Sequence, residues 1–434
     1  MTIILISTTN LNANLLYPGS GSQAWVMPGV TISNNFSFVV KMTGPDGGFI
    51  SDGTILALFS GPGLQMNGAR ESVIFGASSI YRSDAAVGSP SILSSVGFSS
   101  ITNHGLISTQ LGTAIGMIGG GNSIYNDGLI EGGSGGLFLG INGGVGDRLV
   151  NDGTITAGST ILPVFSERFN HAVNIEGDGS VLVNHGTLAA VAAFGSGVNI
   201  GSFSFTGAGS RVENYGAITS ALWWGVDMVT LTNGGATLYN HGLITGGTGG
   251  VRGSAFDDVM TNSGTVQGAI NLNTGNDRYD GRGGVVFGQI IGGDGNDTLI
   301  GGAQDDDMDG GLGNDILRGG AGDDNITGGA GRDVMKGGAG SDVFIFATAS
   351  DIGNTITTRD QIGDFTTKQD VLDFSALPGT LIYIGAAVFS NVAGQLRYTA
   401  ATGVLQGDTN GDSIADFTLA LAPSTVLAAG DLVL

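Results

Sequence analysis

The residues Gly292 to Ile300 read GGDGNDTLI, and five further nine-residue segments built on the same pattern follow without a gap. The first glycines of the Gly-Gly pairs are Gly292, Gly301, Gly310, Gly319, Gly328 and Gly337. An aspartate stands five residues after each of them, at Asp297, Asp306, Asp315, Asp324, Asp333 and Asp342, and a large apolar residue stands two positions later. The unit is G-G-x-G-x-D-x-U-x, where U is apolar, and its fixed period predicts a repeat architecture.

Each unit predicts one tight turn and one short strand. Glycine permits the positive φ of such a turn, and the x-U-x triplet places only its central side chain inward. Two units close one coil, and successive coils stack at about 4.8 Å, so the aspartates on each edge form a ladder. Unit charges about 4 Å apart repel by roughly 4 kcal/mol at an effective dielectric near 20. Such a ladder needs cations between its rungs.

An oxygen-only ligand set of carboxylates and backbone carbonyls suits calcium better than magnesium. The repeat resembles the RTX family, the haemolysin-type calcium-binding repeats. The resemblance implies calcium as the cofactor, bound between Asp297 and Asp315, Asp315 and Asp333, Asp306 and Asp324, and Asp324 and Asp342. It also implies backbone carbonyl ligands from Gly293, Gly295, Gly302, Gly311, Gly313, Gly320, Gly322, Gly329, Gly331, Gly338 and Gly340.

The pattern has two irregularities. Gln304 stands where a third glycine is expected, within a turn that continues as Asp305-Asp306-Asp307. Upstream, Gly275-Asn276-Asp277 looks like a degenerate copy of the unit, but it lies 20 residues before Asp297 and is out of phase with the nine-residue period.

The resemblance continues beyond the repeats. The segments starting at Asp342, Asp360 and Asp370 are similar to the cap of serralysin-type carboxy-terminal domains. The later hairpin carries Asp408, Asn410 and Asp412 at the alternate positions of an EF-hand loop, although Ser413 and Leu419 replace its glycine and glutamate. An additional calcium ion and a simple polar hairpin turn are both open there. The last residues, Asp431-Leu432-Val433-Leu434, resemble the uncleaved signal of type I secretion substrates.

A second repeat fills the amino-terminal two thirds. The phrase Asn-x-Gly, with aliphatic residues two positions before the Asn and two after the Gly, recurs every 22 to 33 residues at Asn103, Asn126, Asn151, Asn184, Asn214, Asn240 and Asn262. One phrase per solenoid coil predicts a parallel β-helix in which the asparagines stack at a corner and hydrogen-bond along the column. The pattern is similar to bacterial adhesins and autotransporter passengers.

Composition excludes several classes of protein. The chain has 81 glycines in 434 residues, no cysteine and a net charge of −22. The charge argues against nucleic acid as a partner, and the lack of cysteine excludes disulfides and cysteine-based zinc clusters. The sequence contains no run of about 18 apolar residues, so it predicts no transmembrane segment. Its amino terminus predicts no secretory signal peptide.

Catalytic motifs are scarce. No H-E-x-x-H sequence occurs, and G-x-S-x-G appears only around Ser134 in a glycine-rich run. His171, near Glu167, Arg168 and Glu176 in the longest coil, is the best enzymatic candidate. The adjacent Trp223 and Trp224 would point to opposite faces of a strand, and an exposed one could stack on a sugar.

These patterns predict an all-β chain: a right-handed parallel β-helix with an amino-terminal cap over residues 1–270, an RTX parallel β-roll over 271–345, and a β-sandwich-like cap with a type I secretion signal over 346–434. The expected function is that of an extracellular calcium-binding protein that folds after type I secretion. Its solenoid would be an adhesin-like or structural module that meets carbohydrate or a cell surface. The alternative is a polysaccharide lyase or epimerase, although no protease, lipase or epimerase motif is present.

Overall fold

The computed structural model describes residues 3–6, 10–11, 15–17, 22–34, 39–42, 45–58, 62–84, 90–133, 135–141, 145–158, 171–191, 195–201, 208–229, 231, 233–423 and 425–434. These residues are almost entirely in β-strands and turns, as predicted. The chain divides into two compact units, Met1–Ala255 and Phe256–Leu434. The boundaries expected at residues 270 and 345 stay predictions.

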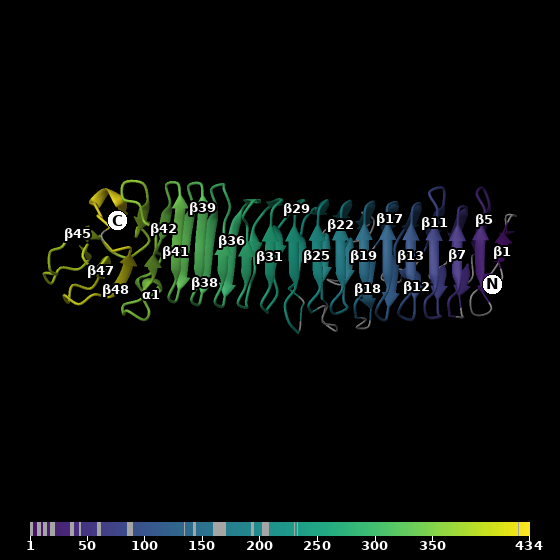
Figure 1. The fold of residues 1–434 in the computed structure, drawn as a ribbon, viewed down its shortest axis with the longest axis horizontal. Helices are drawn as coiled ribbons and strands as arrows, with labels where there is room; N and C mark the ends of the chain where they lie inside the picture. The colour runs from purple at the N-terminus through teal and green to yellow at the C-terminus, as the bar shows by residue number, and fades with distance from the viewer. Residues whose placement is uncertain are drawn as a thin grey trace. The chain divides into compact units, whose positions relative to one another are not determined.

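The first unit is a parallel β-helix whose coils each contribute one strand to three sheets, and successive strands of a sheet run in the same direction (Figure 1). The first sheet contains β1 (Ile3–Ile6), β4 (Gln23–Val26), β7 (Gly48–Ser51), β10 (Ser72–Phe75), β13 (Ser100–Asn103), β16 (Ser123–Asn126), β19 (Arg148–Asn151), β22 (Val181–Asn184), β25 (Arg211–Asn214) and β28 (Thr237–Asn240). The second contains β2 (Asn10–Leu11), β5 (Thr31–Asn34), β8 (Thr54–Ala57), β11 (Ile80–Ser83), β14 (Leu106–Thr109), β17 (Leu129–Gly132), β20 (Thr154–Ala157), β23 (Thr187–Ala190), β26 (Ala217–Ser220) and β29 (Leu243–Gly246). The third contains β3 (Leu15–Tyr17), β6 (Val40–Met42), β9 (Leu64–Met66), β12 (Pro90–Ser94), β15 (Thr113–Ile118), β18 (Gly135–Ile141), β21 (Val173–Ile175), β24 (Val198–Ile200), β27 (Trp224–Asp227) and β30 (Gly249–Arg252).

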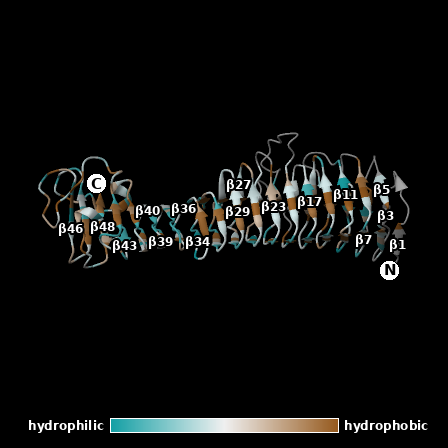
Figure 2. Cartoon of the chain, turned by 90° about the horizontal axis from the view of Figure 1, so that it is seen from above, coloured by the Kyte–Doolittle hydropathy of each residue, from teal (hydrophilic) through white to brown (hydrophobic). Residues whose placement is uncertain are grey.

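The core of this unit consists of stacked aliphatic columns. Ile124 pairs in register with Leu149, Leu149 pairs with Leu182, and all three are buried. The same alternation recurs in the second sheet, where Ile130 and Ile155 are paired and buried. Figure 2 shows apolar residues recurring from coil to coil. Because strand side chains alternate with a period of two, a shift of one residue would bring these columns to the surface, and this fixes the register.

The asparagines of the Asn-x-Gly phrases form a buried hydrogen-bonded column. Asn126 Nδ2 donates to Asn151 Oδ1 at 2.7 Å, and Asn151 Nδ2 donates to Asn184 Oδ1 at 2.8 Å. The same bond joins Asn103 to Asn126, Asn184 to Asn214, and Asn214 to Asn240. The column is the structural role that the sequence predicts for these residues.

A second corner of the same unit uses side-chain oxygens differently. Ser99, Asn122 and Asp147 each directly precede a strand of the first sheet. The backbone N–H of Ser99 donates to Asn122 Oδ1 at 3.1 Å, and the N–H of Asn122 donates to Asp147 Oδ1 at 2.8 Å. The side chains of Asn122 and Asp147 therefore each accept a hydrogen bond from the coil before them.

The second unit begins with two three-stranded coils and continues with two-stranded coils. The first coils consist of β31 (Val259–Asn262), β32 (Thr265–Gln267) and β33 (Ile270–Asn271), then β34 (Arg278–Asp280), β35 (Val285–Phe287) and β36 (Gln289–Asp294). The two-stranded coils pair β37 (Thr298–Ile300) with β38 (Asp307–Leu312), β39 (Ile316–Ala321) with β40 (Asn325–Ala330), and β41 (Val334–Ala339) with β42 (Val343–Ile345). Their apolar U residues, from Leu299 to Phe344, are all buried. This part is the predicted β-roll.

The carboxy-terminal part of the second unit covers the last coil. Strands β43 (Gln361–Ile362) and β44 (Val371–Asp373) extend the two sheets of the roll by pairing with β41 and β42. Strands β46 (Gln395–Thr399), β47 (Val404–Asp408) and β48 (Phe417–Leu421) form an antiparallel meander, joined by β45 (Ile382–Tyr383). A short helix, α1 (Ala349–Ile352), a 3₁₀ turn (Ala429–Asp431) and β49 (Leu432–Val433) complete the unit. In the described part of the chain, no helix is long and apolar enough to cross a membrane.

Candidate calcium ladder

The repeat turns adopt one backbone conformation from coil to coil. Gly311 and Gly313 have φ angles of 103° and 132°, and the glycines one coil later, Gly329 and Gly331, have 92° and 145°. These values lie in the left-handed region, which glycine enters without steric cost. Ten of the eleven glycines expected to supply carbonyl ligands share this conformation, and the exception is Gly302, in the turn that Gln304 interrupts.

The repeat aspartates stack in two ladders, one on each edge of the roll. On the first edge the backbone N–H of Asp297 donates to Asp315 Oδ1 at 2.7 Å, and that of Asp315 donates to Asp333 Oδ1 at 2.8 Å. On the second edge the N–H of Asp306 donates to Asp324 Oδ1 at 2.9 Å, and that of Asp324 donates to Asp342 Oδ1 at 3.1 Å. The structure thus brings together every pair of aspartates between which the family resemblance implies an ion.

Both ladders extend beyond the repeats. The N–H of Asp258 donates to Asp277 Oδ1 at 2.6 Å, and that of Asp277 donates to Asp297 Oδ1 at 2.7 Å. Downstream, the N–H of Asp333 donates to Asp360 Oδ1 at 2.8 Å. On the other edge, the N–H of Asp342 donates to Asp370 Oδ1 at 3.1 Å.

Asp277 is therefore out of phase with the nine-residue period in the sequence, but it stacks in line with the ladder in space. The coil before Asp297 contains a third strand, β35, and needs 20 residues, whereas the coil after it needs 18. The aspartates still align because stacking depends on the corner of the coil, not on the number of residues around it. Asp360 and Asp370 lie in the segments that resemble the cap, 27 residues after Asp333 and 28 residues after Asp342, and no nonapeptide unit leads up to either of them.

The second carboxylate oxygen of most rungs is buried and has no hydrogen-bond partner. This holds for Oδ2 of Asp277, Asp297, Asp315, Asp324, Asp333, Asp342 and Asp360. A buried carboxylate oxygen without a partner is costly, so a row of such oxygens indicates a ligand set for a cation.

The first glycine of each turn borders the space next to this oxygen. A Cβ built on Gly310 would lie 2.5 Å from Asp315 Oδ2 and 2.5 Å from the carbonyl oxygen of Gly328, one coil later. The equivalent two oxygens, the Oδ2 of the aspartate in the same turn and a glycine carbonyl one coil later, surround the position of a Cβ built on Gly292, Gly301 or Gly319. Calcium binds oxygen at about 2.3 to 2.6 Å, so the missing Cβ marks a space that suits the ion. These residues therefore fit calcium, and Gly310, Gly319, Gly328 and Gly337 add carbonyl oxygens that sequence reasoning missed.

The turn at Asp306 differs from the others in its hydrogen bonding. The backbone N–H of Gly302 donates to Asp306 Oδ2 at 2.7 Å, so this oxygen already has a protein donor. The exception falls in the turn where the sequence departs from the repeat at Gln304.

Burial raises the pKa of the ladder carboxyls in the absence of a cation. The pKa of Asp297 rises to about 6, and those of Asp315, Asp324 and Asp333 rise to about 7. Desolvation is the main cause, partly offset by the N–H that each carboxylate accepts from the preceding coil. A proton or a cation is thus needed to neutralise each buried rung near neutral pH.

The hairpin around Asp408 has the geometry of a polar turn. Asp408 is buried, and its two oxygens accept the N–H groups of Gly411 at 2.6 Å and Ser413 at 2.8 Å. Asn410 Oδ1 accepts the N–H of Asp412 at 2.8 Å. These contacts are those of a polar hairpin turn, and both alternatives for this segment, with and without an additional calcium ion, stay predictions.

The enzymatic candidate at His171 does not lie in an open groove. His171 is buried, and its Nδ1 accepts the backbone N–H of Ser196 at 3.0 Å. Glu176 is also buried and accepts from Asn174 Nδ2 at 3.1 Å. Glu167, Arg168 and Ser134 lie outside the described residues.

The tryptophan pair is partly covered. Trp223 and Trp224 are both half-buried, and the guanidinium of Arg252 lies over both rings, 5.3 Å and 5.7 Å from their centroids. Arg252 in turn binds the carboxylate of Asp227, which also accepts from Trp223 Nε1 at 3.1 Å.

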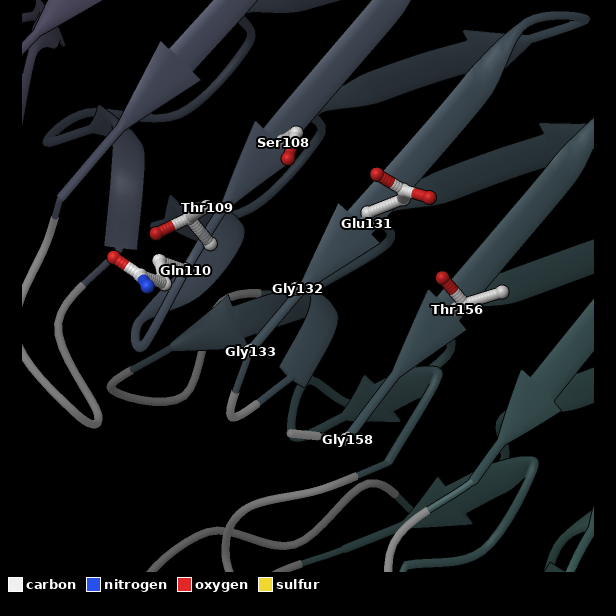
Figure 3. A pocket seen from close by; sticks show the side chains of 8 residues that line it. All are labelled: Ser108, Thr109, Gln110, Glu131, Gly132, Gly133, Thr156 and Gly158. Carbon is white, nitrogen blue, oxygen red and sulfur yellow. The ribbon is translucent and has the colours of Figure 1, made fainter. Parts of the chain in front are cut away.

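A shallow cavity of about 250 Å³ lies on the second sheet of the first unit (Figure 3). Glu131 on β17 borders it, with Ser108 and Thr156 at the same position on the neighbouring strands. Glu131 is the only titratable side chain among the lining residues. Sugar hydrolysis usually employs two carboxyl groups as an acid–base pair, and this lining supplies one.

Within the part of the chain that the structure describes, no group of three or more His, Asp or Glu side chains converges as a metal site. A cation in the ladder would therefore be held by two carboxylates together with backbone carbonyls. That ligand set suits a hard ion of irregular coordination such as calcium.

A match to a known repeat family supports this interpretation of the repeats. The RTX calcium-binding nonapeptide repeat (4 copies) matches residues 289–317 and 310–344. Among solved structures, the chain is similar to the AlgE6R3 subunit of the mannuronan C5-epimerase of Azotobacter vinelandii. That match has 30% identity and a TM-score of 0.26, and it covers 32% of this chain and 78% of the other. No curated protein matches the chain.

Proposed function

We propose that this protein is a secreted calcium-binding module whose β-roll completes its folding when calcium binds between the rungs of the two aspartate ladders. The observation that carries the proposal is the row of buried Oδ2 atoms without partners, of which those of Asp297, Asp315 and Asp324 also lie beside a glycine and a carbonyl oxygen of the next coil. The RTX nonapeptide repeats at residues 289–344 support calcium as the ion.

The ladder explains how binding and folding would be coupled. Asp315 takes part in both adjacent sites of its edge, because it stacks on Asp297 and on Asp333. The carboxylates come together only when the coils stack, so the ligand set does not exist in the unfolded chain. An ion that binds only the folded state stabilises that state by mass action. The bound ion supplies positive charge between carboxylates that otherwise repel.

Hydrogen–deuterium exchange of the full-length protein tests this coupling. We expect peptides from residues 289–345 to exchange slowly with calcium and fast with a chelator. Peptides from the first unit serve as the internal control, since their asparagine column needs no ion. Magnesium at the same concentration tests selectivity. Equal protection of the roll with calcium and with chelator would contradict the proposal.

The proposal extends to export and location. We infer that the chain leaves the cell through a type I secretion apparatus, unfolded at low calcium, and folds outside where calcium is abundant. The resemblance of Asp431 to Leu434 to such signals supports this. A secretion assay with and without these four residues tests it, and equal export of both forms would contradict it.

The first unit is proposed as an adhesin-like or structural module at a cell surface or matrix. Its long parallel β-helix with exposed turn tips supports a surface role, and binding screens of the full chain against glycans and cells test it. For the alternative, a lyase or epimerase activity, the cavity at Glu131 supplies a single carboxyl group.

A further inference from the structure

The turn Asn273–Asp277 is built like the calcium turns but lies upstream of the matched repeats. Asn273 and Gly275 have φ angles of 70° and 136°, as Gly293 and Gly295 one coil later have 111° and 142°. Asn273 is therefore a non-glycine residue held in the left-handed region, at the position of the second repeat glycine. The N–H of Gly275 donates to Asp294 O at 2.9 Å, as that of Gly295 donates to Leu312 O at 2.7 Å.

The side chains of this turn are also in register with the next coil. Asn296 N–H donates to Asn276 Oδ1 at 2.9 Å, and Asn314 N–H donates to Asn296 Oδ1 at 2.8 Å, so an outer column runs beside the aspartates. Asp277 accepts at Oδ1 like every rung that follows it. Its Oδ2 has no hydrogen-bond partner, and the residue is 2% exposed.

One position differs from the calcium turns. The pairs Ile270 with Ile290 and Asn271 with Ile291 place Leu272 opposite Gly292. Leu272 is fully buried. In the following turns this position is a glycine, such as Gly292 or Gly310. A Cβ built on that glycine would lie between the Oδ2 of the repeat aspartate and a carbonyl oxygen of the next coil, and its distances to these two oxygens are close to those of calcium–oxygen bonds. Leu272, at the corresponding position, carries a Cβ and a side chain where the repeat turns carry none.

We propose that Leu272 ends the calcium ladder on its upstream side, because its Cβ occupies the space that an ion takes in the following turns. The turn Asn273–Asp277 is then a latent calcium site, with Asp277, Asp297 and the carbonyl of Gly292 in place and only the ion's space filled. This inference rests on the proposed function, since it presupposes calcium in the turns downstream.

The test counts the calcium ions bound per full-length chain, by equilibrium dialysis and atomic emission. Leu272→Gly should bind one ion more than the unsubstituted protein. Leu272→Ala is the matched control, since it removes nearly the same apolar volume but keeps the Cβ, and it should bind the unsubstituted number. Adding Asp277→Asn to Leu272→Gly should remove the gained ion.

Three outcomes overturn the inference. The first is an equal count for Leu272→Gly and Leu272→Ala. The second is the loss of one ion on Asp277→Asn in the otherwise unsubstituted chain, which would show that the turn already binds calcium. The third is an unsubstituted chain that binds no calcium, which defeats the proposed function itself and is thereby distinguishable from the other two.

A converse substitution decides the question if Leu272→Gly fails to fold. Gly292→Ala places a Cβ in a turn that is proposed to bind an ion, and Gly292 does not have the left-handed φ that only glycine tolerates. The variant should bind one ion fewer. An unchanged count would overturn the role assigned to the Cβ. Circular dichroism confirms the β content of each variant.

Discussion

The backbone N–H of Asp297 donates to Oδ1 of Asp315 at 2.7 Å, while Oδ2 of Asp315 stays buried without a hydrogen-bond partner. Each repeat carboxylate except that of Asp306 therefore has two tasks. One oxygen joins the coils through a backbone hydrogen bond, and the other faces the space beside a glycine. The first contact can exist without an ion, whereas the second leaves a buried charge uncompensated.

Replacement of Asp315 by asparagine should weaken calcium binding at two neighbouring sites. The amide keeps an oxygen but loses the charge that attracts the ion, so we expect the apparent affinity to fall at least about tenfold, or roughly 1.4 kcal/mol. Without calcium the same variant should resist unfolding better, because a buried carboxyl is gone. Calcium titration followed by hydrogen exchange of the roll measures both effects.

Asp307→Asn is the matched control, since Asp307 is exposed on β38 and the variant makes the same change in charge. An equal loss of affinity in both variants would show that Asp315 acts through net charge rather than as a ligand.

Glu71 should make the first unit less stable at alkaline pH. Burial raises its pKa from 4.5 to about 7. Since the folded pKa is above the unfolded one, the stability is fully present below about pH 4.5 and is lost as the pH rises through about 7. Glu71→Gln should remove this dependence and gain at least about 1 kcal/mol at pH 8, since one pKa unit corresponds to about 1.4 kcal/mol.

Urea unfolding at pH 5 and pH 8, at constant calcium, measures the effect of Glu71. Glu131→Gln is the control, because Glu131 is exposed on β17. A parallel pH profile for Glu71→Gln and the unsubstituted protein would contradict the assignment.

Asn151→Ala should destabilise the β-helix through its asparagine column. The substitution removes the bonds to Asn126 and Asn184 and leaves a buried amide group without its partner. The expected cost is about 2 to 4 kcal/mol in urea unfolding, since an unpaired buried polar group costs about 1 to 3 kcal/mol. Asp152→Ala, at the neighbouring exposed turn tip, should cost less than about 1 kcal/mol because its ion pair with His185 lies at the surface.

Asp408→Asn tests the carboxy-terminal hairpin. Asp408 accepts two backbone N–H groups with its two oxygens, and an asparagine can accept with only one. The variant should lose about 1 to 3 kcal/mol of stability, equally with and without calcium. Thermal unfolding under both conditions, with an ion count, checks this. A loss of one bound ion would instead establish the additional calcium site.

The parts of the fold that could be predicted from sequence are those fixed within one coil. The turn and strand of each nonapeptide involve only a few neighbouring residues, so the buried apolar position can be predicted from one unit. The stacked aspartate pairs between Asp297 and Asp342 follow from the nine-residue spacing of the units. The asparagine column follows in the same way, because one Asn-x-Gly corner occurs in each coil.

The parts that escaped prediction depend on coils of unequal length. Asp277 aligns with Asp297 because a third strand adds residues between the corners, and Asp360 aligns with Asp333 across the inserted helix α1. The carbonyl of Gly328 beside Asp315 Oδ2 was not predicted either. Every residue has a backbone carbonyl, so the residue type does not identify which carbonyls are ligands. These contacts form when coils stack on one another, and the nine-residue period of the sequence does not show which residues of unequal coils become neighbours.

The corner at Ser99, Asn122 and Asp147 carries the same contact between a backbone N–H and a side-chain oxygen as the ladder does, in coils without the nonapeptide. A parallel β-helix thus has, as part of its ordinary architecture, a row of oxygens aimed along its axis. Sensitivity to an ion then requires only a carboxylate in that row and a neighbouring residue without a side chain. Such a scaffold can gain or lose responsiveness to its surroundings one coil at a time, by few substitutions, while its backbone path stays the same.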